Sequence, residues 1–278
     1  MDFKVKLLKR RNDSVVYYGD DLFKGTAKYY SKYRPIYPAS LIRYLIRKFS
    51  LDGKGHMLDL GCGTGQLAFR FSDWFERIVG IDTDPEMITE AIDLSKDMRI
   101  ENIQFFNGNL DKYKVNAHTF FKLVTIAKAF HWMDREMVLE TLYEMIPYEG
   151  GIAIIDSYSP NKELSPWQKT LNEVVKQWYG HVRRAGDTTY SHPTISHQQI
   201  VANSKFESDL YQLPTYEYCW SVETIIGHLY STSFGAKRFL GDNVNSFEQN
   251  LREELLSIEE TGVFKEQVNI TVIMALKK

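Results

Sequence analysis

The sequence predicts an α/β protein built on an open, mainly parallel sheet with helices on both faces. Patterns typical of strands and helices alternate from His56 to Ile155, which favours parallel strands joined by crossover helices. Three glycines follow the first strand directly, in the stretch HMLDLGCGTGQ (56–66). The second strand ends in an acid, Asp82, and ligands of such sheets bind beside the carboxyl ends of strands. These features predict a nucleotide-type ligand at that edge.

The segment before the first strand is rich in tyrosine. Tyr29, Tyr30 and Tyr33 lie between Gly25 and Tyr37, interleaved with basic residues. Two interpretations stay open. The tyrosines pack a helix onto the domain, or they form an N-terminal lid that closes over a ligand and offers Arg34 to a carboxylate. Residues 40–49 then show the apolar spacing of a helix that covers the sheet.

The glycine stretch predicts close approach of a ligand to backbone, because Gly61, Gly63 and Gly65 carry no side chains. Gln66 occupies the last position of the dinucleotide pattern, where glycine or alanine is required, and no P-loop lysine follows. Asp59 would repel a pyrophosphate but suits a ligand with ammonium and sulfonium charges. S-adenosylmethionine is such a ligand.

The second strand, 78–81, ends in Asp82, where a carboxylate holds a ribose diol in related nucleotide sites. A helix begins after it at Asp84-Pro85, with proline in the first turn. Met87 lies on the inward face of this helix. It is either a wall of an adenine pocket or ordinary core packing.

Four motifs as a set resemble those of the class I S-adenosylmethionine-dependent methyltransferases. They are DLGCGTG (59–65), GIDTDPEM (80–87), the pattern Y-x-x-x-R-P-x-Y-P at Tyr30–Pro38 and A-x-x-F-H-W at Ala127–Trp132. More narrowly, the sequence resembles the small-molecule branch that includes trans-aconitate and quinone-precursor methyltransferases. The resemblance covers about residues 25–155.

The resemblance implies a Rossmann-like, seven-stranded, mainly parallel sheet, with an N-terminal helical lid and an insertion after strand five. It implies S-adenosyl-L-methionine as cofactor and S-adenosyl-L-homocysteine as product. The cofactor-binding residues that it indicates are Tyr30, Asp59, Gly61, Cys62, Gly63, Gly65, Asp82, Thr83, Met87, Asn109, Leu110, Ala127 and Ala129.

Strands three, four and five are expected at 103–106, 123–127 and 152–155. After strand three, Asn109 stands where relatives usually have an aspartate that accepts from the adenine amino group. Asparagine keeps an acceptor oxygen, although the tract Asn107-Gly108-Asn109 would also form a simple turn. Lys122 replaces the acid that most relatives have just ahead of strand four.

Catalytic residues are expected after strand four, where small Ala127 and Ala129 allow a ligand to approach. His131 is a candidate base or orienting group for the acceptor, since imidazole takes up a proton near neutral pH. The alternative is a structural histidine before the helix at Asp134. Tyr33 is expected beside His131 as the second catalytic residue, and the expected acceptor-binding residues are Arg34, Trp132, Arg183 and Tyr158.

Residues 157–204 are longer than a connection needs and are interpreted as a substrate-covering insertion. They contain three histidines, His181, His192 and His197, whose spacing matches no usual ligand pattern, so no metal is expected. Arg183 and Arg184 suit an acidic substrate better, although exposed arginines are common.

The C-terminal part is predicted to complete the sheet. Strand six is expected over Phe206–Trp220, and a final strand over Val268–Leu276 is expected to lie antiparallel beside it. The expected organisation is 1–50 as the lid and covering helix and 51–156 as the cofactor-binding half. Residues 157–204 are expected to form the insertion, and residues 205–278 are expected to form the C-terminal strands and helices of the same domain.

Composition excludes some function classes. The net charge of −2 and the absence of a basic face argue against nucleic acid, and no apolar run reaches membrane-spanning length. Cys62 and Cys219 are expected to be reduced thiols, which indicates the cytoplasm. A monomer or a homodimer is expected.

The function indicated is methyl transfer to a small organic molecule, with oxygen as the accepting atom. If the acceptor is a carboxylate, Arg34 or Arg183 matters more than His131. Two alternatives stay open: methylation of carbon in a quinone-like ring, and a protein that binds S-adenosylmethionine without catalysis.

Overall fold

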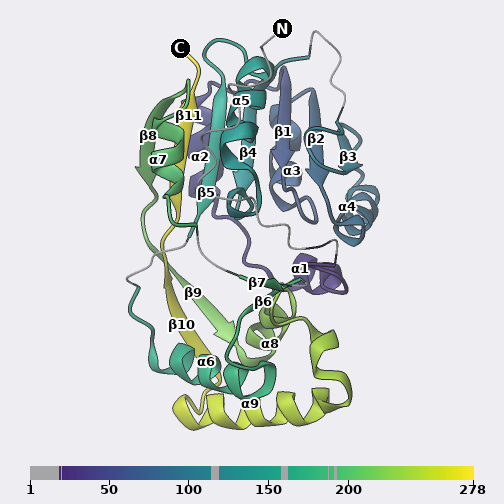
Figure 1. The fold of residues 1–278 in the computed structure, drawn as a ribbon, viewed down its shortest axis with the longest axis vertical. Helices are drawn as coiled ribbons and strands as arrows, with labels where there is room; N and C mark the ends of the chain where they lie inside the picture. The colour runs from purple at the N-terminus through teal and green to yellow at the C-terminus, as the bar shows by residue number, and fades with distance from the viewer. Residues whose placement is uncertain (1–18, 20, 114–118, 158–161, 187, 191–192) are drawn as a thin grey trace, which may run out of the picture.

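The computed structural model describes residues 19, 21–113, 119–157, 162–186, 188–190 and 193–278. A seven-stranded sheet runs in the order β3–β2–β1–β4–β5–β11–β8 (Figure 1). The five parallel strands are β1 (His56–Leu60), β2 (Arg77–Asp82), β3 (Ile103–Asn107), β4 (Phe121–Ala127) and β5 (Gly151–Asp156). The last strand, β11 (Thr271–Leu276), lies antiparallel between β5 and β8 (Glu207–Gln212). The predicted sheet, with its final antiparallel strand beside the sixth, is confirmed.

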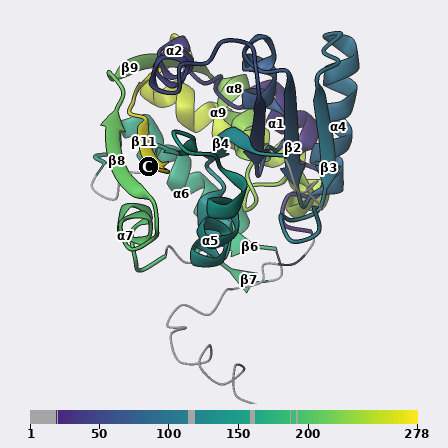
Figure 2. The ribbon, with the colours of Figure 1, turned by 90° about the horizontal axis from the view of Figure 1, so that it is seen from above.

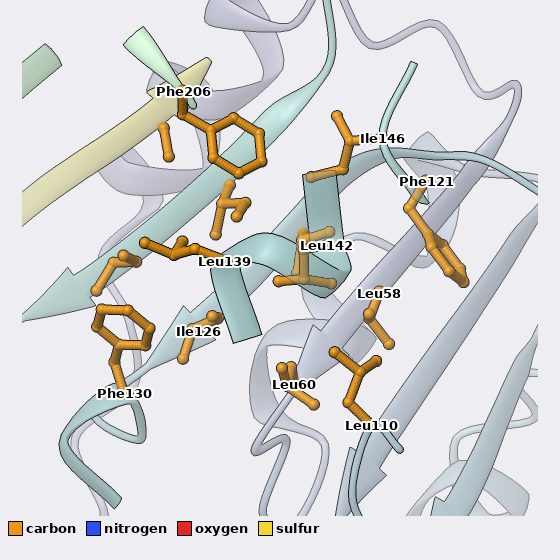
Figure 3. Close-up of a cluster of buried hydrophobic side chains, with 14 of the residues drawn as sticks. Leu58, Leu60, Leu110, Phe121, Ile126, Phe130, Leu139, Leu142, Ile146 and Phe206 are labelled. Atoms are coloured by element: carbon orange, nitrogen blue, oxygen red, sulfur yellow. The ribbon is translucent and has the colours of Figure 1, made fainter. Parts of the chain in front are cut away.

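Helices cover both faces of this sheet because its strands are apolar on both sides. On one face lie α2 (Ala39–Lys48) and α3 (Gln66–Arg70), and on the other lie α5 (Arg135–Met145) and α7 (His197–Ala202), as the view from above shows for α2, α5 and α7 (Figure 2). Leu139 and Leu142 of α5 pack among Leu58, Ile126 and Phe206 (Figure 3). The helix α4 (Pro85–Asp97) follows β2, and the 3-10 turns η1 (Ser72–Trp74) and η2 (Phe130–Trp132) follow α3 and β4.

A second apolar core lies beyond the carboxyl ends of the parallel strands (Figure 1). It is built from α6 (Pro166–Tyr179), α8 (Val222–Tyr230), η3 (Lys237–Asn243), α9 (Val244–Ile258) and the antiparallel pair β9 (Tyr216–Ser221) and β10 (Val263–Val268). The segment 157–204 therefore divides between the two cores, since α6 joins the second and α7 packs on the sheet. Residues 205–278 divide in the same way.

The prediction of one strand over Phe206–Trp220 is wrong. β8 ends at Gln212 and β9 begins at Tyr216, in a different sheet. Pro214 lies in the break and has no N–H to give to a strand ladder. The predicted final strand is also too long, because Val268 ends β10 and the chain re-enters the large sheet only at Thr271. The segment after β8 and the segment before β11 are joined by a hydrogen bond, in which the Leu213 N–H donates to the Ile270 carbonyl at 2.9 Å.

The N-terminal helix α1 (Ala27–Tyr33) lies between the two cores, where it contacts α8 and α4 (Figure 1). The two-residue strands β6 (Arg184–Ala185) and β7 (Thr188–Thr189) pair with each other in a separate sheet. The Tyr33 ring packs on Gly227 of α8, where an added Cβ would lie 2.3 Å from a ring atom. Glycine at this position therefore lets α1 and α8 approach closely. Among the described helices, each is too short or too polar to span a lipid bilayer.

Candidate active site

A cavity opens at the carboxyl ends of β1 and β4, under the segment that follows α1. It brings together residues from three separate parts of the sequence. The cavity is lined by six of the residues that the sequence analysis expects at the site: Tyr30, Arg34, Asp59, Gly61, Cys62 and Ala127. The topology explains this grouping, since β1 and β4 are neighbours in the sheet and their ends meet at one edge.

Asp59 is a desolvated carboxylate on β1, with only 2% of its surface exposed. The Thr125 hydroxyl on β4 donates to Asp59 Oδ1 at 2.7 Å. Burial nevertheless raises the pKa of Asp59 to about 6, because the hydrogen bonds from Thr125 and from the backbone N–H of Ala68 offset only part of the lost solvation. Such a carboxylate binds a cationic ligand group more strongly than an exposed one does.

The glycine loop brings the backbone close to other elements and to the cavity. Gly61 and Gly63 have φ angles of 73° and 53°, in the left-handed region that favours glycine. A Cβ on Gly61 would lie 2.5 Å from Ala129 Cβ, and one on Gly63 would lie 3.3 Å from the Tyr30 ring. Position 129 therefore has room for a small side chain only, because Gly61 packs against it. Ala127, in contrast, lines the cavity.

Asp82 at the end of β2 fixes the loop from the other side. Its Oδ2 accepts from the Gly63 N–H at 2.8 Å, and its Oδ1 accepts from the Asp84 N–H at 3.0 Å. Burial raises the pKa of this carboxyl to about 6 as well. The glycine loop is therefore flanked by two carboxylates, Asp59 and Asp82, that have lost much of their water.

The residues expected around adenine lie at the ends of β2 and β3. Met87 is buried at 2% exposure on α4, and Leu110 is buried in the sheet core. Thr83 is exposed, and its carbonyl accepts from the Asn107 amide. Asn109 is exposed, and its Oδ1 accepts from the Lys112 N–H at 3.1 Å. The Asn109 side chain thus closes a local turn, as the simpler of the two interpretations expects.

Aromatic side chains connect η2 with the N-terminal segment before α1. The Trp132 ring lies 4.4 Å from the His131 ring, 5.1 Å from Tyr190 and 6.2 Å from Phe23, centroid to centroid. Phe23 in turn contacts Tyr30 at 6.5 Å, which lines the cavity. His131 and Trp132 do not line the cavity; they belong to an aromatic wall that joins Phe23 of the N-terminal segment to Tyr190.

Three further predicted residues are placed differently. Tyr33 is not in the cavity lining; it stacks on Tyr29 and packs against α8. Arg183 reaches the aromatic wall, where its guanidinium lies 4.8 Å from the Tyr190 ring and 4.4 Å from the Phe234 ring. Tyr158 lies outside the described residues.

Within the described part of the chain, one group of three side chains has metal-ligand types close together. The ligand atoms of His131, Asp156 and His197 lie within 4.8 Å of one another. However, Arg135 Nη1 lies 3.2 Å from His197 Nδ1, and a guanidinium can only donate. The neutral His197 ring then carries its proton on Nε2, the nitrogen 3.9 Å from Asp156, and a protonated nitrogen does not bind a metal. We interpret His131, Asp156 and His197 as a polar cluster that Arg135 contacts through His197.

Sequence reasoning missed two charged residues of this region, Lys128 and Asp156. Lys128 follows β4 and lines the cavity, and Asp156 ends β5 beside His131. One signal was available for both, because a charged residue at the carboxyl end of a buried parallel strand lies at the ligand edge of the sheet. The contacts of Tyr190 with His131 and Trp132 had no such signal.

Comparison with known proteins gives several matches. Residues 57–150 match a family model described as a methyltransferase domain. The Saccharomyces cerevisiae protein named "Probable S-adenosylmethionine-dependent methyltransferase CRG1" is 27% identical over 149 residues, 53% of this chain and 50% of that protein. A methyltransferase-like protein of Dictyostelium discoideum is 24% identical over 265 residues, 93% of this chain and 95% of that protein.

Among solved structures, YcgJ of Bacillus subtilis aligns with a TM-score of 0.53 at 16% identity, covering 86% of this chain and 98% of that chain. This likeness concerns the fold alone. In sequence, the chain spans about half the length of the first curated relatives that it matches, 50% of the yeast protein and 54% of YcgJ.

Proposed function

Since the chain belongs to the class I S-adenosylmethionine-dependent methyltransferases, we propose that it methylates a small organic acceptor, with oxygen as the accepting atom. The observation that carries the proposal is the pair of desolvated carboxylates, Asp59 and Asp82, on either side of the glycine loop. A ligand that presents cationic groups and a ribose diol to these carboxylates suits them, whereas a pyrophosphate is repelled.

The residues of the cavity fit S-adenosylmethionine, which supplies a methyl group activated by its sulfonium charge. Asp59 would hold the ammonium group and Asp82 the ribose hydroxyls. The backbone from Gly61 to Gly65 would lie against the ligand, because Gly61, Gly63 and Gly65 have no side chains to keep it away. Met87, Asn109 and Leu110 would surround the adenine ring, with Thr83 at the ribose edge.

His131 would remove the proton of the acceptor hydroxyl. The cofactor would supply the methyl group to the acceptor oxygen and would leave as a neutral thioether that keeps the electron pair of its carbon–sulfur bond, so the proton is what His131 would have to hold. Trp132 and Tyr190 would orient the acceptor against His131, since their rings lie 4.4 and 5.8 Å from its imidazole. Most of the rate would come from alignment at near-attack distance, with proton removal as the second contribution.

Arg183 would form the outer limit of the acceptor site, because its guanidinium stacks on Tyr190. The phenol ring of Tyr33 is assigned to helix packing and takes no part in this proposal.

A turnover assay tests the proposal. Purified protein is incubated with methyl-labelled S-adenosylmethionine and single members of a set of alcohols, phenols, carboxylic acids and quinols. We expect S-adenosylhomocysteine to accumulate in equal amount with labelled acceptor, and only when an acceptor is present. Label on ring carbon instead of oxygen would contradict O-methylation. Cofactor binding without turnover of any class would indicate a binding protein.

A further inference from the structure

We propose that His228 of α8 is an acceptor-binding residue, whose imidazole makes a hydrogen bond to a hydroxyl group of the acceptor. The inference rests on the proposed function and deepens it, because it assigns part of the acceptor site to the second core. It also gives the acceptor a chemical class, a hydroxylated molecule in preference to an amine.

The last turn of α8 lies against the segment that lines the cavity. Arg34, a cavity residue, donates from Nη2 to the Ser231 carbonyl at 3.0 Å. The Tyr33 ring packs on Gly227. Gly227 and Ser231 are one residue before and three residues after His228, so the His228 side chain leaves α8 within one turn of both contacts.

The His228 ring is held on one side and free to bind on the other. The Trp220 ring of β9 lies 4.9 Å from it, centroid to centroid, and Trp220 Nε1 is itself fixed by donating to Glu266 at 2.9 Å. In the part of the chain that the structure describes, neither ring nitrogen of His228 has a hydrogen-bond partner. The residue is half-buried and its nitrogens keep accessible surface. A polar ring that is positioned in this way can take a ligand group as its partner.

The charges around His228 keep its imidazole neutral. Burial, and then the positive charges of Arg34 and Lys128, lower the pKa of His228 well below its usual range. Arg34 and Lys128 both line the cavity. Because the interaction between charges weakens with distance, their effect indicates that the His228 ring lies on the side of the cavity where these two residues lie.

A neutral imidazole with two cations nearby selects a hydroxyl group. One ring nitrogen donates and the other accepts, and a hydroxyl can do both, so it pairs with either nitrogen. A protonated amine would meet the positive charges of Arg34 and Lys128, whereas Asp59, the carboxylate of the cavity, is assigned to the cofactor. The site therefore suits an alcohol or a phenol.

The test follows the histidine ring signals by nuclear magnetic resonance in the presence of S-adenosylhomocysteine. The probes are benzyl alcohol, hydroquinone and benzylamine, of which the first and the last differ only in the hydroxyl and the ammonium group. His228→Gln identifies the His228 signal by its loss. His56→Gln is the matched control, because His56 begins β1 at the opposite end of the parallel strands.

We expect benzyl alcohol or hydroquinone to shift the His228 signal in a saturable way and benzylamine to leave it unchanged. With any acceptor that is methylated in the turnover assay, His228→Gln should raise the KM for that acceptor about 10-fold or more. Its affinity for S-adenosylhomocysteine should stay at the wild-type value. His56→Gln should match the wild type in both measurements.

The proposal is overturned if none of the probes moves the His228 signal, or if benzylamine moves it as strongly as benzyl alcohol does. It is also overturned if His228→Gln leaves the KM unchanged, or if the KM and the affinity for S-adenosylhomocysteine worsen together, since the role of His228 would then be in packing. A wild-type protein that transfers no methyl group refutes the proposed function instead, and the histidine signals still decide the role of His228.

Discussion

The carboxylate of Asp82 accepts a hydrogen bond from the backbone N–H of Gly63 at 2.8 Å, which joins the tip of β2 to the glycine loop after β1. The same carboxylate also accepts from the Asp84 N–H, so one side chain holds the loop and the start of α4 in register. A carboxylate oxygen has two acceptor sites, and each oxygen of Asp82 can therefore accept from a ribose hydroxyl in addition.

Asp82→Ala is expected to weaken S-adenosylhomocysteine binding about 10- to 100-fold. The change removes charge-assisted hydrogen bonds to the ligand, each contributing about 1.5–3 kcal/mol, and it also frees the Gly63 N–H. Calorimetric titration measures the effect. Asp93→Ala, on the exposed face of α4, is the control and should bind as the wild type does. Equal affinity in both variants would remove Asp82 from the ribose site.

Asp59→Asn is expected to stabilise the ligand-free protein and to weaken cofactor binding. The raised pKa of Asp59, about 6 against 3.8, means that its ionised form costs about 3 kcal/mol in the folded state. Asparagine carries no charge and keeps one oxygen that accepts from Thr125, but it loses the acceptor for the Ala68 N–H, so the net gain is smaller than this cost. Urea unfolding at pH 7.5 should show a higher free energy of unfolding. A less stable variant would contradict the assignment of Asp59 as a desolvated charge.

The two raised pKa values also predict how pH acts. Below about pH 4 Asp59 and Asp82 are protonated in both the folded and unfolded states, and above about pH 6 both are ionised in both states. Between these limits the folded state binds more protons, so these groups make the ligand-free protein less stable as pH rises. Affinity for S-adenosylhomocysteine should rise over the same interval, because its ammonium prefers ionised carboxylates.

Thermal melting with and without S-adenosylhomocysteine measures both effects of pH. The increase in Tm caused by the ligand should grow from pH 5 to pH 7.5. An increase that stays constant would mean that neither carboxylate contacts a ligand cation.

His131→Ala is expected to lower turnover about 100-fold or more while changing the affinity for S-adenosylhomocysteine little. The reason is that His131, which contacts Trp132 and Tyr190, is proposed to act on the acceptor and not to hold the cofactor. Initial rates and calorimetric titration together separate these effects. His181→Ala, an exposed residue after α6, is the control. Unchanged turnover would reduce His131 to a structural role.

The sequence predicted the parallel part of the sheet and the cofactor loop because these depend on local patterns. Buried strands read as apolar runs, and a glycine-rich turn followed by a helix is visible without any tertiary information. Asp59 and Asp82 were found for the same reason, since each occupies a fixed place relative to a strand end. Asn109 was open to two interpretations, and only the contact with Lys112 favours the turn.

The parts that were missed depend on contacts between distant segments. The second core gathers α6 with α8 and α9, and nothing in the spacing of apolar residues indicates which helices share a core. Tyr33 lies three residues after Tyr30, so the helical spacing predicts the same face for both residues. Its ring packs instead on Gly227, a contact with a distant part of the sequence. Lys128 did have a local signal, a charge at the carboxyl end of a buried strand, but that it lines the same cavity as Arg34 depends on the fold.

The most direct test of the central claim is a calorimetric titration of the purified protein with S-adenosylhomocysteine, with NADH as the control ligand. The two desolvated carboxylates beside the glycine loop predict micromolar binding of S-adenosylhomocysteine and no binding of NADH, whose pyrophosphate Asp59 would repel. Binding of NADH alone would contradict the cofactor assignment and, with it, the roles given to Asp59 and Asp82.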